Sequence, residues 1–221
     1  MRNIVFVAPF PAEATLRFVR ATKALGSVSL LGVVHHPPSE DLFDDVARVD
    51  DPMDLPQLYA AVKRLAQRRG PIHRIIGILE PLQVHLAILR ERLGVEGIDV
   101  HTAELFRDKA RMKDALRAAG LPCARHKLLR DVGDAASFLD EVGLPIVVKP
   151  PDGMGAKATW RISSLDQLKA ALSAVRPTPA SPMLAEELVR GTEHSFDTIT
   201  LDGEIQMASM TDYLPTPLEV L

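Results

Sequence analysis

The sequence predicts an α/β protein whose first part is a doubly wound parallel sheet and whose second part has α+β character. Short apolar runs alternate with helical patterns over about the first 100 residues. After residue 102 the pattern changes to a long, charged helical stretch followed by short segments of both kinds. The chain has 221 residues, 47% hydrophobic and 25% charged, which is typical of a soluble globular protein with a substantial core.

The first part contains three apolar runs that are typical of buried parallel strands, at residues 4–8, 27–34 and 72–79. Between and after them lie helical patterns at residues 12–25, 54–69 and 80–93. Gly26 follows the first helical pattern and Gly70-Pro71 ends the second, as expected at helix C-termini. We therefore expect a Rossmann-like domain over residues 1–102.

The second part begins with a predicted helix over residues 103–119, which Gly120 and Pro122 end. Predicted strands follow at 124–129, 145–149 and 158–162, and predicted helices at 134–142 and 164–175. A segment with three prolines, 176–182, precedes strands at 183–188 and 193–210, with turns at Arg190-Gly191 and Asp202-Gly203. We expect one subdomain over 103–182 and the opening strands of another over 183–221.

Composition excludes several function classes. There are 26 Lys and Arg residues against 29 Asp and Glu, a net charge of −3, so we expect no nucleic-acid partner. No apolar run approaches the roughly 18 residues of a membrane span, and we expect no membrane association. Cys123 is the only cysteine, and the N-terminus does not have the pattern of a secretion signal. These features predict a cytoplasmic protein.

The segment 143–162 carries the clearest chemical signal. An apolar strand ends at Lys149, and the loop that follows contains Gly153, Gly155 and Lys157. Alternate glycines let backbone N–H groups face an anion, and the lysine adds positive charge, so the loop could cover a phosphate group. The spacing fits neither a P-loop nor a dinucleotide fingerprint. An ordinary hairpin turn with a solvated lysine is the alternative interpretation.

The order of motifs along the chain resembles the ATP-grasp superfamily, which includes carboxylate–amine ligases and biotin carboxylase-like enzymes. Asp108-Lys109 lies near the start of the charged helical stretch, and the strand G-L-P-I-V-V-K-P then leads into the glycine loop. The segment E-E-L-V-R-G-T-E, from Glu186 to Glu193, follows. Each motif is weak alone, and the ordered set of motifs is specific.

The resemblance implies a role for each matching residue. Lys109 and Lys149 would reach the nucleotide phosphates, and the loop from Gly153 to Lys157 would fold over the triphosphate. The segment from Glu186 to Val189 would present backbone groups to the adenine edge, and Glu193 would accept hydrogen bonds from the ribose hydroxyls. The implied nucleotide-binding residues are Lys109, Lys149, Gly153, Gly155, Lys157, Glu186, Glu187, Val189 and Glu193. Exposed charged surface on the helix and strand is the alternative for Lys109 and the glutamates.

The resemblance also implies Mg²⁺, held by acidic residues and an asparagine well after the ribose glutamate. Mg²⁺ prefers carboxylate, phosphate and water oxygens. The acidic residues after Glu193 do not form a Glu-x-Asn pattern; they are Asp197, Asp202, Glu204, Asp212 and Glu219. We therefore assign no metal ligand and no catalytic residue within the sequence, and expect most metal ligands beyond its end.

The resulting hypothesis is an ATP-binding protein that forms part of an ATP-dependent ligase. Such an enzyme activates a small-molecule carboxylate as an acyl phosphate and joins it to an amine. The alternative is a non-catalytic nucleotide-binding fragment or degenerate paralogue without a metal site. The sequence leaves open the identity of both substrates, catalytic competence, and whether the chain forms a homo-oligomer.

Overall fold

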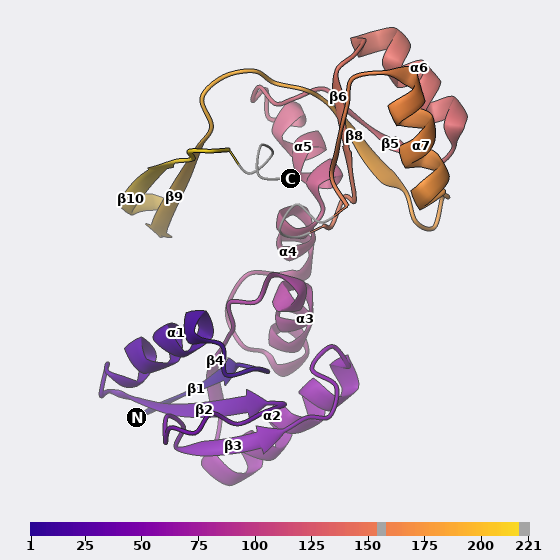
Figure 1. The fold of residues 1–221 in the computed structure, drawn as a ribbon. Helices are drawn as coiled ribbons and strands as arrows, with labels where there is room; N and C mark the ends of the chain where they lie inside the picture. The colour runs from indigo at the N-terminus through magenta and orange to yellow at the C-terminus, as the bar shows by residue number, and fades with distance from the viewer. Residues whose placement is uncertain (154–157, 217–221) are drawn as a thin grey trace. The chain divides into compact units, whose positions relative to one another are not determined.

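The computed structural model of the chain describes residues 1–153 and 158–216. The chain divides into two compact units, Met1–Arg107 and Asp108–Leu221 (Figure 1). The division therefore falls after Arg107, slightly later than the boundary at residue 102 that the sequence indicated. No helix in the described ranges is both long and apolar enough to cross a membrane.

The first unit is built on a parallel sheet with strand order β3-β2-β1-β4, in which the second and third strands lie on one side of β1 and the fourth on the other. The strands are β1 (Arg2–Val7), β2 (Val28–Val34), β3 (Asp45–Arg48) and β4 (Ile72–Ile76). The helices are α1 (Glu13–Lys23), α2 (Leu55–Arg69), the short η1 (Glu80–Leu82), α3 (Gln83–Leu93) and α4 (Val100–Arg107).

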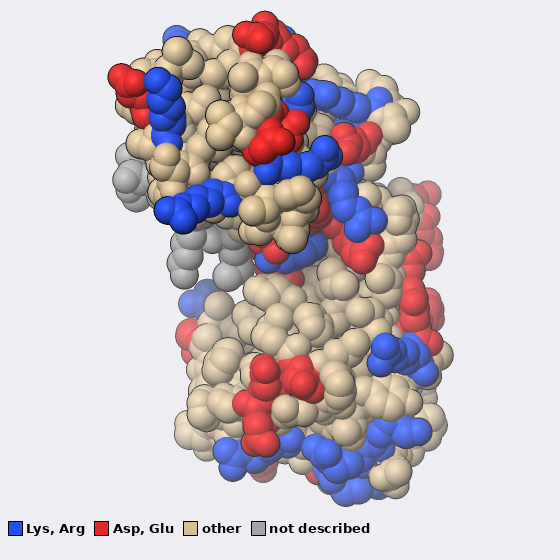
Figure 2. Space-filling view, turned by 90° about the vertical axis from the view of Figure 1, so that its right-hand side faces the viewer, with Lys and Arg blue, Asp and Glu red and all other residues tan. Residues whose placement is uncertain are grey.

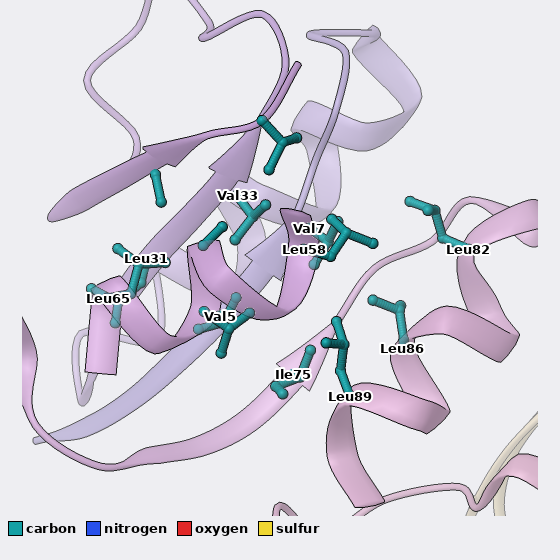
Figure 3. Close-up of a cluster of buried hydrophobic side chains, with 14 of the residues drawn as sticks. Val5, Val7, Leu31, Val33, Leu58, Leu65, Ile75, Leu82, Leu86 and Leu89 are labelled. Carbon is teal, nitrogen blue, oxygen red and sulfur yellow. The ribbon is translucent and has the colours of Figure 1, made fainter. Parts of the chain in front are cut away.

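Helices cover both faces of this sheet because its strands are apolar on both sides. One core joins alternate residues of the strands, such as Val5 and Leu31, to Leu58 of α2 and Leu86 of α3 (Figure 3). The opposite face of the sheet packs against Val19 of α1 and its neighbours. This arrangement confirms the predicted doubly wound α/β fold.

The strand β3 was not predicted from the sequence. It is only four residues long, begins with Asp45 and ends with Arg48, and pairs on one side only, with β2. A short edge strand with charged ends lacks the continuous apolar run of the inner strands. Its partner β2 is very closely packed, since a Cβ on Gly32 would lie 2.8 Å from the ring of Phe43.

The expected long helix over 103–119 is in fact two helices, and this prediction was wrong. Helix α4 ends at Arg107, and α5 (Lys109–Ala118) begins after an extended residue, Asp108. The Asp108 carboxylate accepts hydrogen bonds from the backbone N–H groups of Ala110 and Arg111. An aspartate in this position satisfies the free N–H groups of a new helix, so it divides the stretch in two.

The second unit contains a four-stranded antiparallel sheet with strand order β5-β8-β6-β7. The sheet strands are β5 (His126–Leu129), β6 (Ile146–Lys149), β7 (Trp160–Ile162) and β8 (Met183–Glu187), and the helices beside α5 are α6 (Val132–Val142) and α7 (Leu165–Val175). The sequence placed the start of another subdomain at Met183, whereas β8 is an inner strand of this sheet. The division at residues 182 and 183 stays a prediction.

The strands β9 (His194–Leu201) and β10 (Glu204–Asp212) form a separate hairpin. Asp202 and Gly203 both have positive φ angles, 51° and 82°, as the expected turn at this dipeptide requires. Nearly all of the hairpin is exposed, including Phe196 at 65%. An isolated two-stranded hairpin has no core to cover its apolar side chains.

Surface charges of both signs are mixed. Figure 2 shows Lys and Arg side chains interspersed with Asp and Glu side chains on the face in view. This distribution agrees with the small net charge of −3.

Asp45 gives a testable link between pH and stability. Arg68 donates two hydrogen bonds of 2.9 Å to its carboxylate, and with help from Arg69 this lowers the pKa of Asp45 to about 2. Because the folded-state pKa is below the unfolded value, the stabilisation is complete above pH ~4 and is lost as pH falls toward ~2. We predict that Asp45→Asn lowers the free energy of unfolding at pH 7 by about 1–2 kcal/mol.

Urea unfolding at pH 7 and pH 3 checks this prediction. The difference between wild type and Asp45→Asn should be smaller at pH 3. The matched control is Asp140→Asn on the exposed surface of α6, which should leave stability unchanged. An equal loss of stability for Asp45→Asn at both pH values would contradict the role given to the ion pair.

Candidate functional site

The sheet of the second unit has one apolar face and an opposite face that mixes charged and apolar side chains, since Leu128 and Leu184 lie on the same side as Glu186. Leu129, Ile146, Val148, Ile162 and Ala185 point into the core that α6 and α7 complete. The opposite face is set by strand register, because residues paired directly across strands lie on the same side of a sheet. His126 pairs with Glu186, Glu186 with Val147, and Val147 with Arg161.

This row of residues, with Lys149 two positions after Val147 on β6, defines what we call the polar face. It brings together Lys149 and Glu186, which the sequence singled out, with His126 and Arg161, which it did not. A sheet face that carries two cationic side chains, a carboxylate and a histidine is suited to a polar, anionic ligand. The candidate site therefore lies on this side of the sheet.

Lys149 and Lys113 share the carboxylate of Glu186, and we call these three residues the lysine–glutamate triad. The Lys149 Nζ lies 2.6 Å from Glu186 Oε2, and the Lys113 Nζ lies 3.4 Å from Oε1. The exposed fractions of the side chains are 9% for Glu186, 13% for Lys113 and 23% for Lys149. Two ammonium groups and one carboxylate leave one positive charge in a largely buried place.

The two oxygens of Glu186 are held differently. The contact from Lys113 to Oε1 is an ion pair without hydrogen-bond geometry, and Oε1 is a buried acceptor with no hydrogen-bond partner among the described residues. A buried carboxylate oxygen without a hydrogen bond is uncommon and unfavourable. Glu186 Oε1 can therefore still accept a hydrogen bond, and it lies in a group with two ammonium ions, those of Lys113 and Lys149.

Lys109 occupies the first turn of α5, four residues before Lys113, so the two side chains lie on neighbouring positions of one helix face. Its Nζ donates a 2.7 Å hydrogen bond to the carbonyl of Gly153, and its backbone N–H donates to the carbonyl of Pro151. These bonds fix the start of α5 against the loop that follows β6. Lys109 is thus anchored at the loop that Lys149 directly precedes in the chain.

Gly155 and Lys157 lie outside the described residues, together with positions 154 and 156. Their predicted role at the phosphates stays a prediction. Gly153 is described, and a Cβ there would come within 3.3 Å of the ring of Pro150. The loop therefore folds tightly back on its own proline.

The Glu187 carboxylate is paired with Arg125. It accepts hydrogen bonds of 2.8 Å from both the backbone N–H and the Nε of Arg125. The backbone hydrogen bond, followed by the side-chain one, lowers the pKa of Glu187 below its ordinary value. Its carboxylate joins the end of β8 to the start of β5, so only its backbone groups remain for the predicted adenine contact.

A cavity of about 510 Å³ lies beside the segment that follows β8. Its lining brings together Val189 and Glu193 from the sequence prediction with Arg161 from the polar face. The other lining residues are Leu188, Arg190, Gly191, Thr192 and Thr216. Both Glu193 and Arg161 are exposed, so their polar groups are accessible to a ligand.

Sequence reasoning did not identify Lys113 and Arg161 as site residues. Lys113 stands four residues after Lys109 on one helix face, and this spacing was a usable signal. Arg161 gives no motif signal, because its place opposite Val147 follows only from the pairing of β6 with β7. His126 is also placed by register, and its Nε2 lies 3.1 Å from Asp114 Oδ1.

The described residues do not form a magnesium site by themselves. Mg²⁺ needs oxygen ligands in near-octahedral geometry. Within residues 1–153 and 158–216, no group of three or more His, Cys, Asp or Glu side chains could hold a metal ion. Asp197, Glu204 and Asp212 lie on the exposed strands of the hairpin, and Asp202 lies in its turn.

Amino acid ligases are similar to this chain in sequence and in fold. An L-arginine-specific L-amino acid ligase of Bacillus subtilis is 31% identical over 176 residues, which cover 77% of this chain and 42% of that protein. A D-alanine–D-alanine ligase of Pseudomonas fluorescens is 31% identical over 103 residues, covering 47% of this chain and 32% of that protein. The crystal structure of an L-amino acid ligase from Bacillus licheniformis aligns with a TM-score of 0.78 at 18% identity, covering 96% of this chain and 50% of that one. No family model matches the sequence.

The fold and the sequence similarity define a chain built like ATP-dependent ligases. A further solved structure with this fold is N5-carboxyaminoimidazole synthetase from Staphylococcus aureus complexed with ADP, with a TM-score of 0.71 at 16% identity. The chain belongs to the ATP-grasp superfamily, as its ordered motifs indicated. It spans about half the length of these relatives or less.

The capping of α5 can be tested directly. Asp108→Ala removes the side chain that caps the helix carrying Lys109 and Lys113, and we predict a loss of about 1 kcal/mol in the free energy of unfolding. Ser164→Ala is the matched control, because Ser164 caps α7 in the same unit. Urea unfolding should show a similar loss for both variants, and faster amide hydrogen exchange at the start of α5 only for Asp108→Ala. Unchanged exchange there would contradict the assigned cap.

Proposed function

We propose that the second unit binds ATP on its polar face and that the protein takes part in an ATP-dependent ligation of a carboxylate to an amine. The observation that carries the proposal is the gathering of Lys109, Lys113 and Lys149 around one loop and one carboxylate. Cationic side chains fixed in advance suit a triphosphate, because charge neutralisation and positioning are the main tasks in phosphoryl transfer.

The nucleotide has a place for each of its parts. Lys109 and Lys149 contact the phosphates, and the backbone from Glu186 to Val189 contacts the adenine edge. Glu193, in the lining of the cavity, accepts hydrogen bonds from the ribose hydroxyls. Arg161 lines the same cavity and adds a cation that can lie over the plane of the base.

The proposed reaction has two steps. An oxygen of the substrate carboxylate attacks the γ-phosphorus of ATP, and the bond to the β–γ bridging oxygen breaks, which releases ADP and forms an acyl phosphate. The amine nitrogen then attacks the acyl carbon, inorganic phosphate leaves, and the nitrogen loses a proton. The lysines offset the charge that develops on the transferred group, and no side chain needs to form a covalent bond.

Amino acids are the proposed class of substrate. The names of the relatives support this, since they include an L-amino acid ligase, an alanine–anticapsin ligase and a D-alanine–D-alanine ligase. Mg²⁺ would accompany the nucleotide, with ligands outside the described residues. A cytoplasmic location also stays a prediction from composition.

A second candidate function is nucleotide binding without turnover. The observation that favours it is the lack of a metal-binding group of side chains within residues 1–153 and 158–216. Release of phosphate from ATP in the presence of Mg²⁺ and amino acid pairs distinguishes the two. Phosphate release that depends on amino acids supports the ligase, and tight nucleotide binding without any release supports the binding protein.

Replacement of Lys149 tests the nucleotide site. We predict that Lys149→Met weakens binding of ATP with Mg²⁺ by roughly 10–100-fold, because a charge-assisted contact to phosphate is lost. The matched control is Lys169→Met on the surface of α7. The Lys169 side chain is 78% exposed, and its ion pair with Asp166 is long at 3.9 Å. Isothermal titration calorimetry measures both, and circular dichroism confirms that each variant is folded. Equal affinity of wild type and Lys149→Met would refute the site.

A further inference from the structure

We propose that Lys113 is a positioning residue that retains Glu186 when Lys149 leaves that carboxylate for the nucleotide phosphates. The proposal rests on the nucleotide site proposed above. It gives a role to a lysine that the motifs did not assign. It also explains why one carboxylate is placed between two ammonium groups.

The two contacts within the triad are unequal. Lys149 makes the shorter ion pair, with its Nζ 2.6 Å from Glu186 Oε2. Lys113 lies 3.4 Å from Oε1, and that oxygen accepts no hydrogen bond among the described residues. Without nucleotide, Lys149 is therefore tightly held by Glu186, and Lys113 is close but not fully engaged.

Nucleotide binding changes the balance of these charges. To contact a phosphate, the Lys149 ammonium has to weaken its bond to Glu186. Glu186 is largely buried, and a buried carboxylate that loses its partner is strongly unfavourable. Lys113 can complete its contact with Oε1 by a small movement, so the carboxylate stays paired throughout.

Lys113 also acts on the electrostatics of the ligand. Glu186 carries a negative charge on the face where a triphosphate would bind, and this charge repels the nucleotide. A second ammonium group offsets the repulsion, and the buried position reduces screening by salt. The triad with Lys113 is net positive, whereas without Lys113 it would be neutral and would bind Lys149 alone.

Nucleotide titration of a set of variants tests the proposal. The probe is a non-hydrolysable ATP analogue with Mg²⁺, measured by calorimetry on the full chain. We expect Lys113→Met to weaken binding about tenfold, since one buried charge interaction is lost. Lys113→Arg should restore most of the affinity, and the surface control Lys169→Met should bind as wild type does.

A double variant separates positioning from a general structural effect. In Lys113→Met the full charge of Glu186 holds Lys149, so adding Glu186→Gln should release Lys149 and recover most of the lost affinity. Glu186→Gln alone should bind at least as tightly as wild type. A merely structural role of Lys113 would make the double variant weaker than either single one.

The outcomes are distinct. Recovery in the double variant supports the proposal, and so does rescue by Lys113→Arg. Wild-type affinity in folded Lys113→Met would overturn it, as would a double variant no better than Lys113→Met. If Lys113→Met does not fold, a large loss of affinity in Glu186→Gln alone would overturn it. If the wild-type chain does not bind the analogue at all, the proposed function itself fails, and this inference fails with it.

Discussion

The buried carboxylate of Glu186 between Lys113 and Lys149 is the interaction on which the site depends. A carboxylate in this position is stable only while it is paired, because an unpaired buried charge is strongly unfavourable. The three residues come from α5, β6 and β8, so the triad ties a helix to two inner strands of the sheet. It also fixes two ammonium groups next to the loop that Lys109 holds through Gly153. Pre-formed positive charge on one sheet face is the feature that makes this unit suitable for a phosphorylated ligand.

The strand register decides which side chains share that face. His126, Glu186, Val147 and Arg161 form one row across the four strands, and the neighbouring row faces the apolar core beneath α6 and α7. Since side chains alternate along a strand, a shift of one residue in β8 would move Glu186 into that core. The apolar packing of the far face therefore specifies the position of the charged residues on the near face. Stability and binding are linked through the same pairing of strands.

The sequence was sufficient to predict the doubly wound first part, because its inner strands are continuous apolar runs, as for Val5 and Leu31. It was not sufficient for β3, because a short edge strand with charged ends lacks a continuous apolar run. It was also not sufficient for the break at Asp108, because the capping of α5 by this carboxylate is visible only in the structure. At the site, local motifs identified Lys149 and Glu186 by resemblance. The contact of Glu186 with Lys113 and the place of Arg161 depend on pairing between distant segments, which no local pattern records.

Chemical labelling of lysines tests the central claim most directly, since it reports on each ammonium group separately. Limited acetylation of the folded chain, followed by mass spectrometry, would be compared with and without saturating ATP and Mg²⁺. The account predicts that labelling of Lys109 and Lys149 falls several-fold with nucleotide, while labelling of the exposed Lys169 stays the same. Equal labelling of Lys149 with and without nucleotide, under conditions where calorimetry shows binding, would contradict the assignment of the polar face as the phosphate site.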